Sequence, residues 1–212
     1  MGKLSVLRDT IKAHLLLQIQ NGELQVGKTI NLAALSRATG ISVTPIREAL
    51  SQLEQAQVLQ AVPNRGFVVA KLSKTEVKNL IEIVAQLEVM ALEHVEFNAD
   101  EMDVLGQLQS KMEMVDSLAE GLTARFHFHN HLVQHCTNKV LLQILKDLKL
   151  RLHFYEYDFI QDFDFFKKLS NQTRSVVEAI EQDNVPTAAL ILRMHWMSIL
   201  EHIEGQINLK KG

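Results

Sequence analysis

The stretch from Gly40 to Ala70 constrains the fold of this chain more than any other part of it. Its first half contains an apolar stripe at positions i, i+3, i+4 and i+7, formed by Ile46, Ala49, Leu50 and Leu53. This spacing predicts a helix that packs one face on a small core and leaves polar side chains on the other.

The ends of this helix are also specified by the sequence. Pro45 has no N–H to lose in a first helical turn, and Ser42 or Thr44 is suited to cap it. The helical pattern stops near Ala56. We therefore expect a short, well-defined helix whose outward face carries Arg47.

Two short β-prone runs follow, at residues 58–62 and 67–71, and Pro63-Asn64-Arg65-Gly66 joins them as a turn. The pair predicts a hairpin with an arginine at its tip. A recognition helix in the major groove with such a wing beside it is a common way to bind DNA. The alternative is an ordinary helix and hairpin, each with one arginine.

The segment resembles the winged-helix signature of the GntR family of bacterial transcription regulators. The matching residues are Gly40-Ile41-Ser42, Thr44 to Leu50, Leu53 and Arg65 to Val69. The resemblance implies DNA contacts, which we assign to Arg37, Ser42, Thr44, Arg47, Asn64, Arg65 and Gly66. The chain departs from the family at Val43 and Ala33, where charged residues that touch DNA are common.

The distribution of charge agrees with this assignment. Residues 1–71 contain eight lysines and arginines against four acidic residues, a net charge of +4, whereas residues 72–212 carry −7. Phosphate contact requires a basic surface, and the basic part of the chain is the part with the DNA-binding pattern.

The remainder of the chain predicts successive amphipathic helices and no strand. Ser73 and Glu76 form the sequence pattern of a capping box, which places a helix start and a domain boundary near residue 72. The expected helices cover residues 3–20, 32–39, 74–96, 99–119, 123–136, 139–159, 163–182 and 186–204. We therefore expect a mainly α protein: a winged helix-turn-helix domain (1–72), an all-helical bundle (73–205) and a tail (206–212).

A helical domain after a GntR-type wing resembles the FCD effector-binding domain of the FadR subfamily. The supporting residues are Leu87-Glu88, Phe128-His129, Asn138, Ala179-Ile180 and His195. The resemblance implies a small-molecule effector site in the bundle and, in many members, a divalent metal bound by one aspartate and three histidines.

Carried over to this chain, those four positions are Arg125, His129, Thr173 and His195. Two ligands are absent, and one is replaced by a cation, so a metal on His129 and His195 is disfavoured. Arg125 and His129 lie one helical turn apart and can instead bind an anionic group directly. An apolar effector and a vestigial polar core remain open alternatives, the former because Val84 replaces an arginine of the family.

A second histidine pattern, His127, His131 and His135, supports a different reading, a histidine-rich metalloenzyme. No HExxH motif, paired carboxylates or nucleophile motif accompanies it, so we expect no enzyme. A stripe of this kind is more often a solvated helix face.

The sequence thus predicts a ligand-responsive DNA-binding transcription regulator, a repressor that binds a palindromic operator as a homodimer. A constitutive dimer with a vestigial ligand site is the alternative. One cysteine, Cys136, excludes an internal disulfide, and we find neither a signal peptide nor a run of roughly 20 apolar residues. We expect a cytoplasmic protein with no membrane contact.

Overall fold

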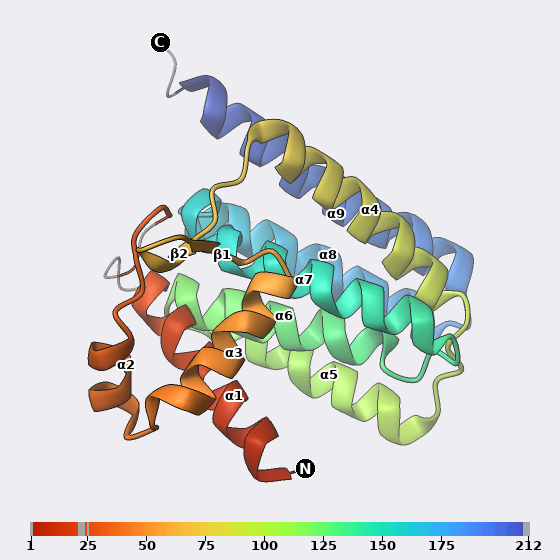
Figure 1. The fold of residues 1–212 in the computed structure, drawn as a ribbon. Coiled ribbons are helices and arrows are strands. Elements are labelled where there is room, and N and C mark those ends of the chain that lie inside the picture. Colours follow the sequence, from red (N-terminus) through yellow and green to blue (C-terminus); the bar gives the residue numbers. More distant parts are fainter. Residues whose placement is uncertain (1, 21–23, 25, 210–212) are drawn as a thin grey trace. The chain divides into compact units, whose positions relative to one another are not determined.

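The structure, a computed structural model, describes residues 2–20, 24 and 26–209. Helices form most of it, and one small antiparallel hairpin provides the strands (Figure 1). The chain divides into two compact units, Met1–Leu72 and Ser73–Gly212. The expected fold class, mainly α with a winged helix-turn-helix and a helical bundle, is therefore confirmed.

Three helices build the core of the N-terminal unit: α1 (Gly2–Gln20), α2 (Leu32–Thr39) and α3 (Val43–Gln55). Helix α1 packs on both α2 and α3. Their inward faces are fully or almost fully buried, with Ile11 and Leu15 from α1, Leu35 from α2, and Ile46, Ala49, Leu50 and Leu53 from α3. The apolar stripe predicted from the sequence is the stripe that is buried.

The hairpin consists of β1 (Leu59–Val62) and β2 (Gly66–Val69), paired from Leu59↔Val69 to Val62↔Gly66. The turn between them needs left-handed backbone at Asn64 (φ 62°) and Gly66 (φ 80°), residue types that adopt it readily. The Glu54 carboxylate accepts a hydrogen bond from the Ala61 N–H at 3.0 Å, which ties the hairpin to the end of α3.

Six helices follow in the C-terminal unit: α4 (Lys74–Leu92), α5 (Ala99–Glu113), α6 (Leu118–Val133), α7 (Lys139–Phe159), α8 (Phe163–Glu181) and α9 (Val185–Leu209). Helix α9 packs on α4 and α8, α5 packs on α6 and α8, and α7 packs on α4 and α6. The capping box predicted at Ser73 and Glu76 is present at the start of α4.

The structure corrects three predicted helix ends. The break between α5 and α6, predicted at residues 120–122, lies at residues 114–117 in the structure. Helix α6 starts five residues before its predicted start, because Ser117 accepts a hydrogen bond from the Glu120 N–H and caps the helix there. Helix α4 ends at Leu92 rather than at residue 96. Helix α9 continues through Gly205 to Leu209, since a single glycine costs a helix only about 1 kcal/mol; residues 206–209 are therefore not a tail.

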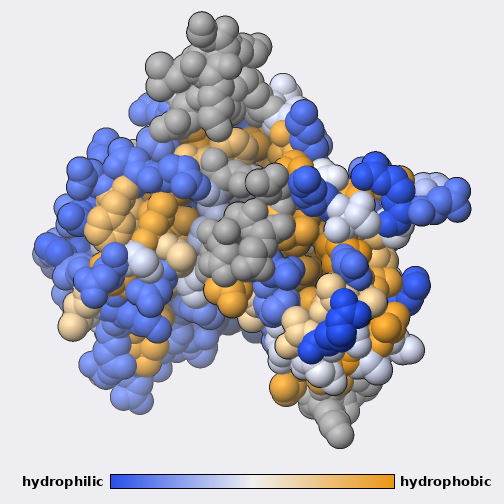
Figure 2. All heavy atoms as spheres, turned by 90° about the vertical axis from the view of Figure 1, so that its left-hand side faces the viewer, coloured by the Kyte–Doolittle hydropathy of each residue, from blue (hydrophilic) through white to orange (hydrophobic). Residues whose placement is uncertain are grey.

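No helix in the described part of the chain is both long enough and apolar enough to span a membrane. On the face shown in Figure 2, hydrophilic residues surround apolar patches of limited size. The apolar residues are instead concentrated in the interiors of the two units.

Candidate nucleic-acid interface and candidate effector site

The outward face of α3 carries the polar residues expected to meet DNA. Ser42, Thr44 and Arg47 are all exposed, whereas Ile46 beside Arg47 is buried. Ser42 is the N-cap residue of α3, but its side chain makes no capping hydrogen bond within the described residues. Its hydroxyl therefore remains available to an external acceptor or donor.

The turn that sets α3 against α2 is fixed by local hydrogen bonds. Gly40 ends α2 in left-handed backbone (φ 68°), and the Ser36 hydroxyl donates to the Ile41 carbonyl at 2.7 Å. Arg37, in the last turn of α2, is exposed. The residue expected to contact phosphate thus lies on α2, which packs on the predicted recognition helix α3.

The tip of the hairpin presents the remaining predicted contacts. Asn64, Arg65 and Gly66 are exposed, and the Arg65 guanidinium donates to the Thr29 hydroxyl at 3.5 Å. Thr29 itself is bridged to Val68 of β2. The arginine at the wing tip therefore has a neutral partner and keeps its positive charge uncompensated in this contact.

The C-terminal unit buries many polar side chains in its core. They are Glu88, Gln109, Arg125, His129, Lys149, His153, Glu156, Ser170, Thr173 and His195. Buried charges are retained only where they are paired and hydrogen-bonded, so this cluster must form specific contacts.

Glu88 of α4, fully buried, is the centre of one contact set. Its carboxylate accepts from Trp196 Nε1 at 2.6 Å and from His129 Nδ1 at 2.9 Å, and it forms an ion pair with Lys149. Burial raises the pKa of Glu88, but His129 and Lys149 outweigh it and lower the pKa to about 2. The carboxylate is therefore ionised at neutral pH.

Arg125 of α6 forms the second ion pair. Its Nη1 donates to Glu156 Oε1 of α7 at 2.7 Å, and its guanidinium lies over the Trp196 ring at 4.9 Å from the centroid. Burial raises the pKa of Glu156, but Arg125, His153 and His129 together outweigh burial, and the pKa of Glu156 is lowered. Both buried carboxylates thus have a basic side chain beside them, Lys149 at Glu88 and Arg125 at Glu156.

His129 and His195 meet between these ion pairs, with their Nε2 atoms 3.2 Å apart. Burial lowers the pKa of both rings, and that of His195 most strongly, so both are neutral at neutral pH. Since His129 Nδ1 donates to Glu88, its Nε2 accepts, and the proton between the rings belongs to His195. His195 Nδ1 is then a bare acceptor.

Five buried polar atoms in this core have no hydrogen-bond partner among the described residues. Two of them face an ionic partner, Glu88 Oε1 at Lys149 and His153 Nδ1 at Glu156, and the other three are Arg125 Nε, Arg125 Nη2 and His195 Nδ1. Two donors and one acceptor left unpaired would cost about 1–3 kcal/mol each. A water molecule or a polar ligand atom would therefore gain the most binding free energy by pairing with these atoms.

Thr173 of α8 belongs to a separate contact set. Its hydroxyl lies 2.6 Å from Gln109 Oε1 and 2.8 Å from the Ser170 carbonyl. No hydrogen bond joins it to Arg125, His129 or His195 within the described residues. Of the four positions predicted from the sequence, Arg125, His129 and His195 are therefore connected to one another through Trp196 and the histidine pair. Thr173 is instead bound to Gln109.

The residues present do not fit the divalent metal that the family resemblance implies. Two imidazole nitrogens 3.2 Å apart could share a metal. However, the described residues contain no group of three His, Cys, Asp or Glu side chains placed to hold one. The Arg125 charge also lowers the pKa of both imidazoles, in addition to burial as the largest cause, and the same charge would repel a metal cation.

Sequence reasoning missed Lys149, His153, Glu156 and Trp196 as members of this core. A signal for two of them was present: Leu145, Lys149, Leu152 and Glu156 follow one another at steps of four, three and four on α7. A charged residue in register with an apolar stripe is an indication of a buried ion pair.

The other histidine pattern lies outside the core. His127 and His135 are exposed, and His131 and His135 contact each other edge to face with centroids 6.4 Å apart. His135, which is half-exposed, lies 3.2 Å from Glu101, whose side chain is 14% exposed. This arrangement is a solvated helix face rather than a shaped site.

Comparisons with known proteins cover both units. Residues 7–69 match the family of bacterial regulatory proteins called the gntR family, and residues 79–198 match the FCD domain. The HTH-type transcriptional repressor GlaR of Escherichia coli is 26% identical over 199 residues, which cover 88% of this chain and 90% of GlaR. The uncharacterized HTH-type transcriptional regulator YdhC of Bacillus subtilis is 26% identical over 193 residues, with coverage of 88% and 86%.

Solved structures share the fold. McbR/YncC of E. coli superposes with a TM-score of 0.79 at 20% identity and covers 95% of this chain and 98% of its own. A GntR protein from Rhodococcus sp. RHA1 superposes with a TM-score of 0.78 at 15% identity, covering 93% and 97%.

Proposed function

The chain belongs to the GntR family of bacterial regulatory proteins and carries an FCD domain, and we propose that it binds a palindromic operator as a homodimer through α3 and the wing. It is a DNA-binding transcription regulator with a ligand-binding domain. The observation that carries the proposal is the exposed face of α3, with Arg47 at its centre, in a basic domain whose wing presents Arg65.

The proposed division of contacts follows from chemistry. Arg47 and Thr44 on α3 are placed to meet base edges in the major groove, and Arg65 with Asn64 and Gly66 to enter the adjacent minor groove. Arg37 and the Ser42 hydroxyl are suited to phosphate oxygens. Val43 is 39% exposed on the same helix and offers an apolar contact, such as a thymine methyl group, where relatives commonly carry charge.

Exposed apolar residues of the C-terminal unit support the homodimer. Seven of them lie on α4 and on α7 and α9, the two helices that pack on α4: Ile83, Met90, Val140, Ile144, Leu190, Met194 and Met197. Uncovered apolar side chains on one set of neighbouring helices favour association with a second copy. Sedimentation of the full chain tests this, because a monomer at micromolar concentration would exclude it.

For the effector we propose a small polar molecule with acceptor oxygen atoms, bound in the core at Arg125, His129 and His195. Support comes from the unpaired Arg125 Nε and Nη2 donors. A strongly anionic ligand would compete with Glu156 for Arg125, so a neutral or singly charged oxygen ligand suits the site better. A constitutive dimer with this core closed by its own ion pairs is the second candidate, favoured by the pairing of both carboxylates.

We propose that its role is regulatory rather than catalytic, and that it acts in the bacterial cytoplasm, where the chromosome lies. We further propose that it represses, with ligand and DNA weakening each other's binding.

A mobility-shift titration with the DNA upstream of the chain's own gene tests the operator proposal. We expect a shift at nanomolar protein in about 0.15 M salt, at least about 10³-fold tighter than a scrambled fragment of the same length. Equal affinity for the two fragments would contradict operator recognition. Thermal-shift screening of oxygen-rich metabolites separates the two effector candidates, because a ligand of the folded state raises Tm.

A further inference from the structure

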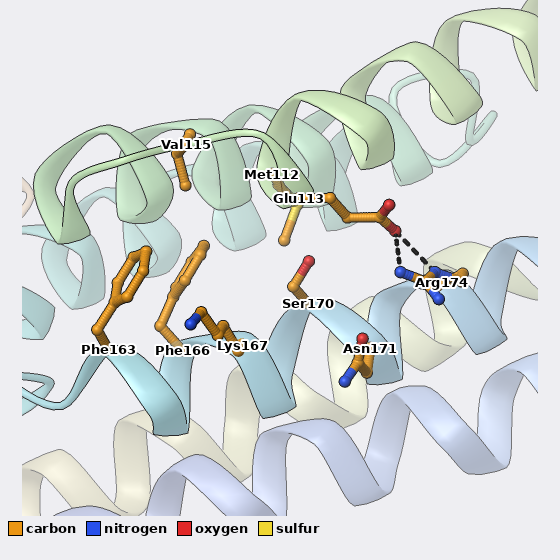
Figure 3. A pocket seen from close by; sticks show the side chains of 9 residues that line it. All are labelled: Met112, Glu113, Val115, Phe163, Phe166, Lys167, Ser170, Asn171 and Arg174. Atoms are coloured by element: carbon orange, nitrogen blue, oxygen red, sulfur yellow. Dashed lines mark hydrogen bonds and ion pairs between the residues drawn. The ribbon is translucent and has the colours of Figure 1, made fainter.

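A cavity of about 210 Å³ lies between the end of α5 and the first half of α8 (Figure 3). None of Arg125, His129, Thr173 and His195 lines it, so it is distinct from the core site. An apolar cavity of about 150 Å³ holds a benzene molecule. This cavity is therefore large enough for one ring with a small polar substituent.

One part of the cavity wall is apolar and preformed. Phe166 of α8 is almost fully buried, and its ring packs directly on Gly121 of α6, where an added Cβ would lie 2.5 Å from it. Met112 and Val115 face it from α5 and the segment after it (Figure 3). An aromatic ring between these residues would be held by dispersion and stacking.

The other part of the wall carries two cations. The Lys167 ammonium lies over the Phe163 ring at 5.0 Å from the centroid and 3.8 Å from Asp164, with the side chain 63% exposed. Arg174 is held at the far end by Glu113, through Nη2 at 2.6 Å and Nε at 2.7 Å. Lys167 is the cation that can turn to a new anionic partner without breaking a close ion pair.

A chain of hydrogen bonds leads from this cavity towards the core. Glu113 Oε1, which binds Arg174, also accepts from Gln109 Nε2 at 3.0 Å, and Gln109 Oε1 lies 2.6 Å from the Thr173 hydroxyl. Gln109 and Thr173 are buried. A ligand that drew Arg174 away from Glu113 would therefore alter the hydrogen bonds of a buried residue of α8.

We propose that this cavity is a second small-molecule site, for a small carboxylate with an aromatic or apolar body. The body lies on Phe166 between Met112 and Val115, and the carboxylate is bound by Lys167. Arg174, through Glu113 and Gln109, connects the site to Thr173. The inference goes beyond the effector proposed for the core, and its test involves no DNA, so its failure would leave the operator proposal standing.

Calorimetric titration of the full chain with benzoate, acetate and benzyl alcohol tests the ligand class. We expect benzoate to bind with a Kd of order 1 mM, acetate at least about tenfold more weakly because it lacks the ring, and benzyl alcohol about two- to fivefold more weakly because it lacks the charge. If benzyl alcohol bound with the same Kd as benzoate, the cations would not contribute to binding and the proposed ligand class would be wrong. Absence of benzoate binding up to saturating concentration would overturn the site.

Two variants and a matched control locate the binding. Lys167→Met should weaken benzoate binding about two- to fivefold, the worth of a solvent-exposed ion pair, whereas Lys168→Met, at the adjacent exposed position outside the cavity, should not change it. Glu113→Gln should strengthen binding by a similar factor, because it removes a negative charge from the cavity wall. Equal effects of the two lysine substitutions, or weaker binding by Glu113→Gln, would place benzoate elsewhere and overturn the proposal.

Discussion

The two units of this protein use charge in opposite ways. In the N-terminal unit the core is apolar, and Arg37, Arg47 and Arg65 lie on the surface. In the C-terminal unit Arg125 and Lys149 are 2% and 3% exposed, inside the bundle, with Glu156 and Glu88 as partners. The same residue types are therefore exposed to solvent in one unit and paired with carboxylates in the interior of the other.

This contrast predicts where substitutions change stability and where they change binding. A surface cation is solvated whether or not its partner is present, so its removal costs little. A buried ion that loses its partner keeps its desolvation penalty without compensation. The four predictions below run from the largest expected effect on stability to the smallest.

Glu88→Ala should cost the C-terminal unit about 3–5 kcal/mol, because it leaves Lys149 buried without its carboxylate and removes the acceptor of Trp196 Nε1. Trp196 is the only tryptophan of the chain, so its fluorescence during urea unfolding reports this unit. Glu82→Ala on the same helix is the control. Glu82 lies 3.9 Å from Lys78 at half-exposed positions and should contribute less than about 0.5 kcal/mol.

Acid should destabilise the C-terminal unit. Because the folded-state pKa values of His129 and His195 are lowered, the unfolded chain binds more protons below about pH 6.5, and stability falls as pH falls. From pH 7 to 5 we expect a loss of roughly 2–4 kcal/mol, followed between pH 4.5 and 2 by the loss of the Glu88 contribution.

Urea unfolding followed by Trp196 fluorescence at a series of pH values measures this loss. His195→Leu should flatten the dependence between pH 7 and 5, because one of the two groups no longer takes up a proton on unfolding. A free energy of unfolding that is constant from pH 7 to 5 would show that the core histidines are already charged or already solvated.

Gly121→Ala should destabilise the bundle by about 1–3 kcal/mol, since the added methyl group would lie 2.5 Å from the buried Phe166 ring. Gly106→Ala provides the control on α5. Nothing lies within 4 Å of its added Cβ, so the substitution should stabilise the helix by about 0.5–1 kcal/mol. Stabilisation by both substitutions would mean that Phe166 is not packed against α6.

Much of the fold followed from short-range rules in the sequence. The buried stripe of α3, the start of α4 at the Ser73 and Glu76 capping box, and the limits of α2 and α7 are set by local periodicity and caps. The connection at residues 114–117 was misplaced because the weak apolar pattern of Val115, Leu118 and Ala119 continues past the end of α5.

The buried polar core was accessible only in part. Arg125, His129 and His195 were placed by resemblance, but the resemblance could not supply their partners. Glu88 and Lys149 are 61 residues apart in the chain, and Arg125 and Glu156 are 31 apart, so no short motif contains either pair. Their pairing depends on how α4, α6 and α7 pack. Local patterns do not encode that packing.

Arg47→Ala should leave stability unchanged within about 0.5 kcal/mol, because Arg47 is exposed and the buried stripe of α3 does not involve it. We expect this substitution to lower the affinity for DNA only. Thermal unfolding of the variant beside the wild-type protein checks the first half of this prediction, and a shift in Tm of more than a few degrees would contradict it.

Operator affinity tests the role of α3 most directly, and fluorescence anisotropy of labelled operator DNA measures it for wild-type protein, Arg47→Ala and the control Lys168→Ala. We expect Arg47→Ala to weaken operator binding by about 1–3 kcal/mol, roughly 5- to 150-fold, and Lys168→Ala to leave it unchanged. Equal operator affinity for all three proteins would contradict the assignment of α3 as the recognition helix.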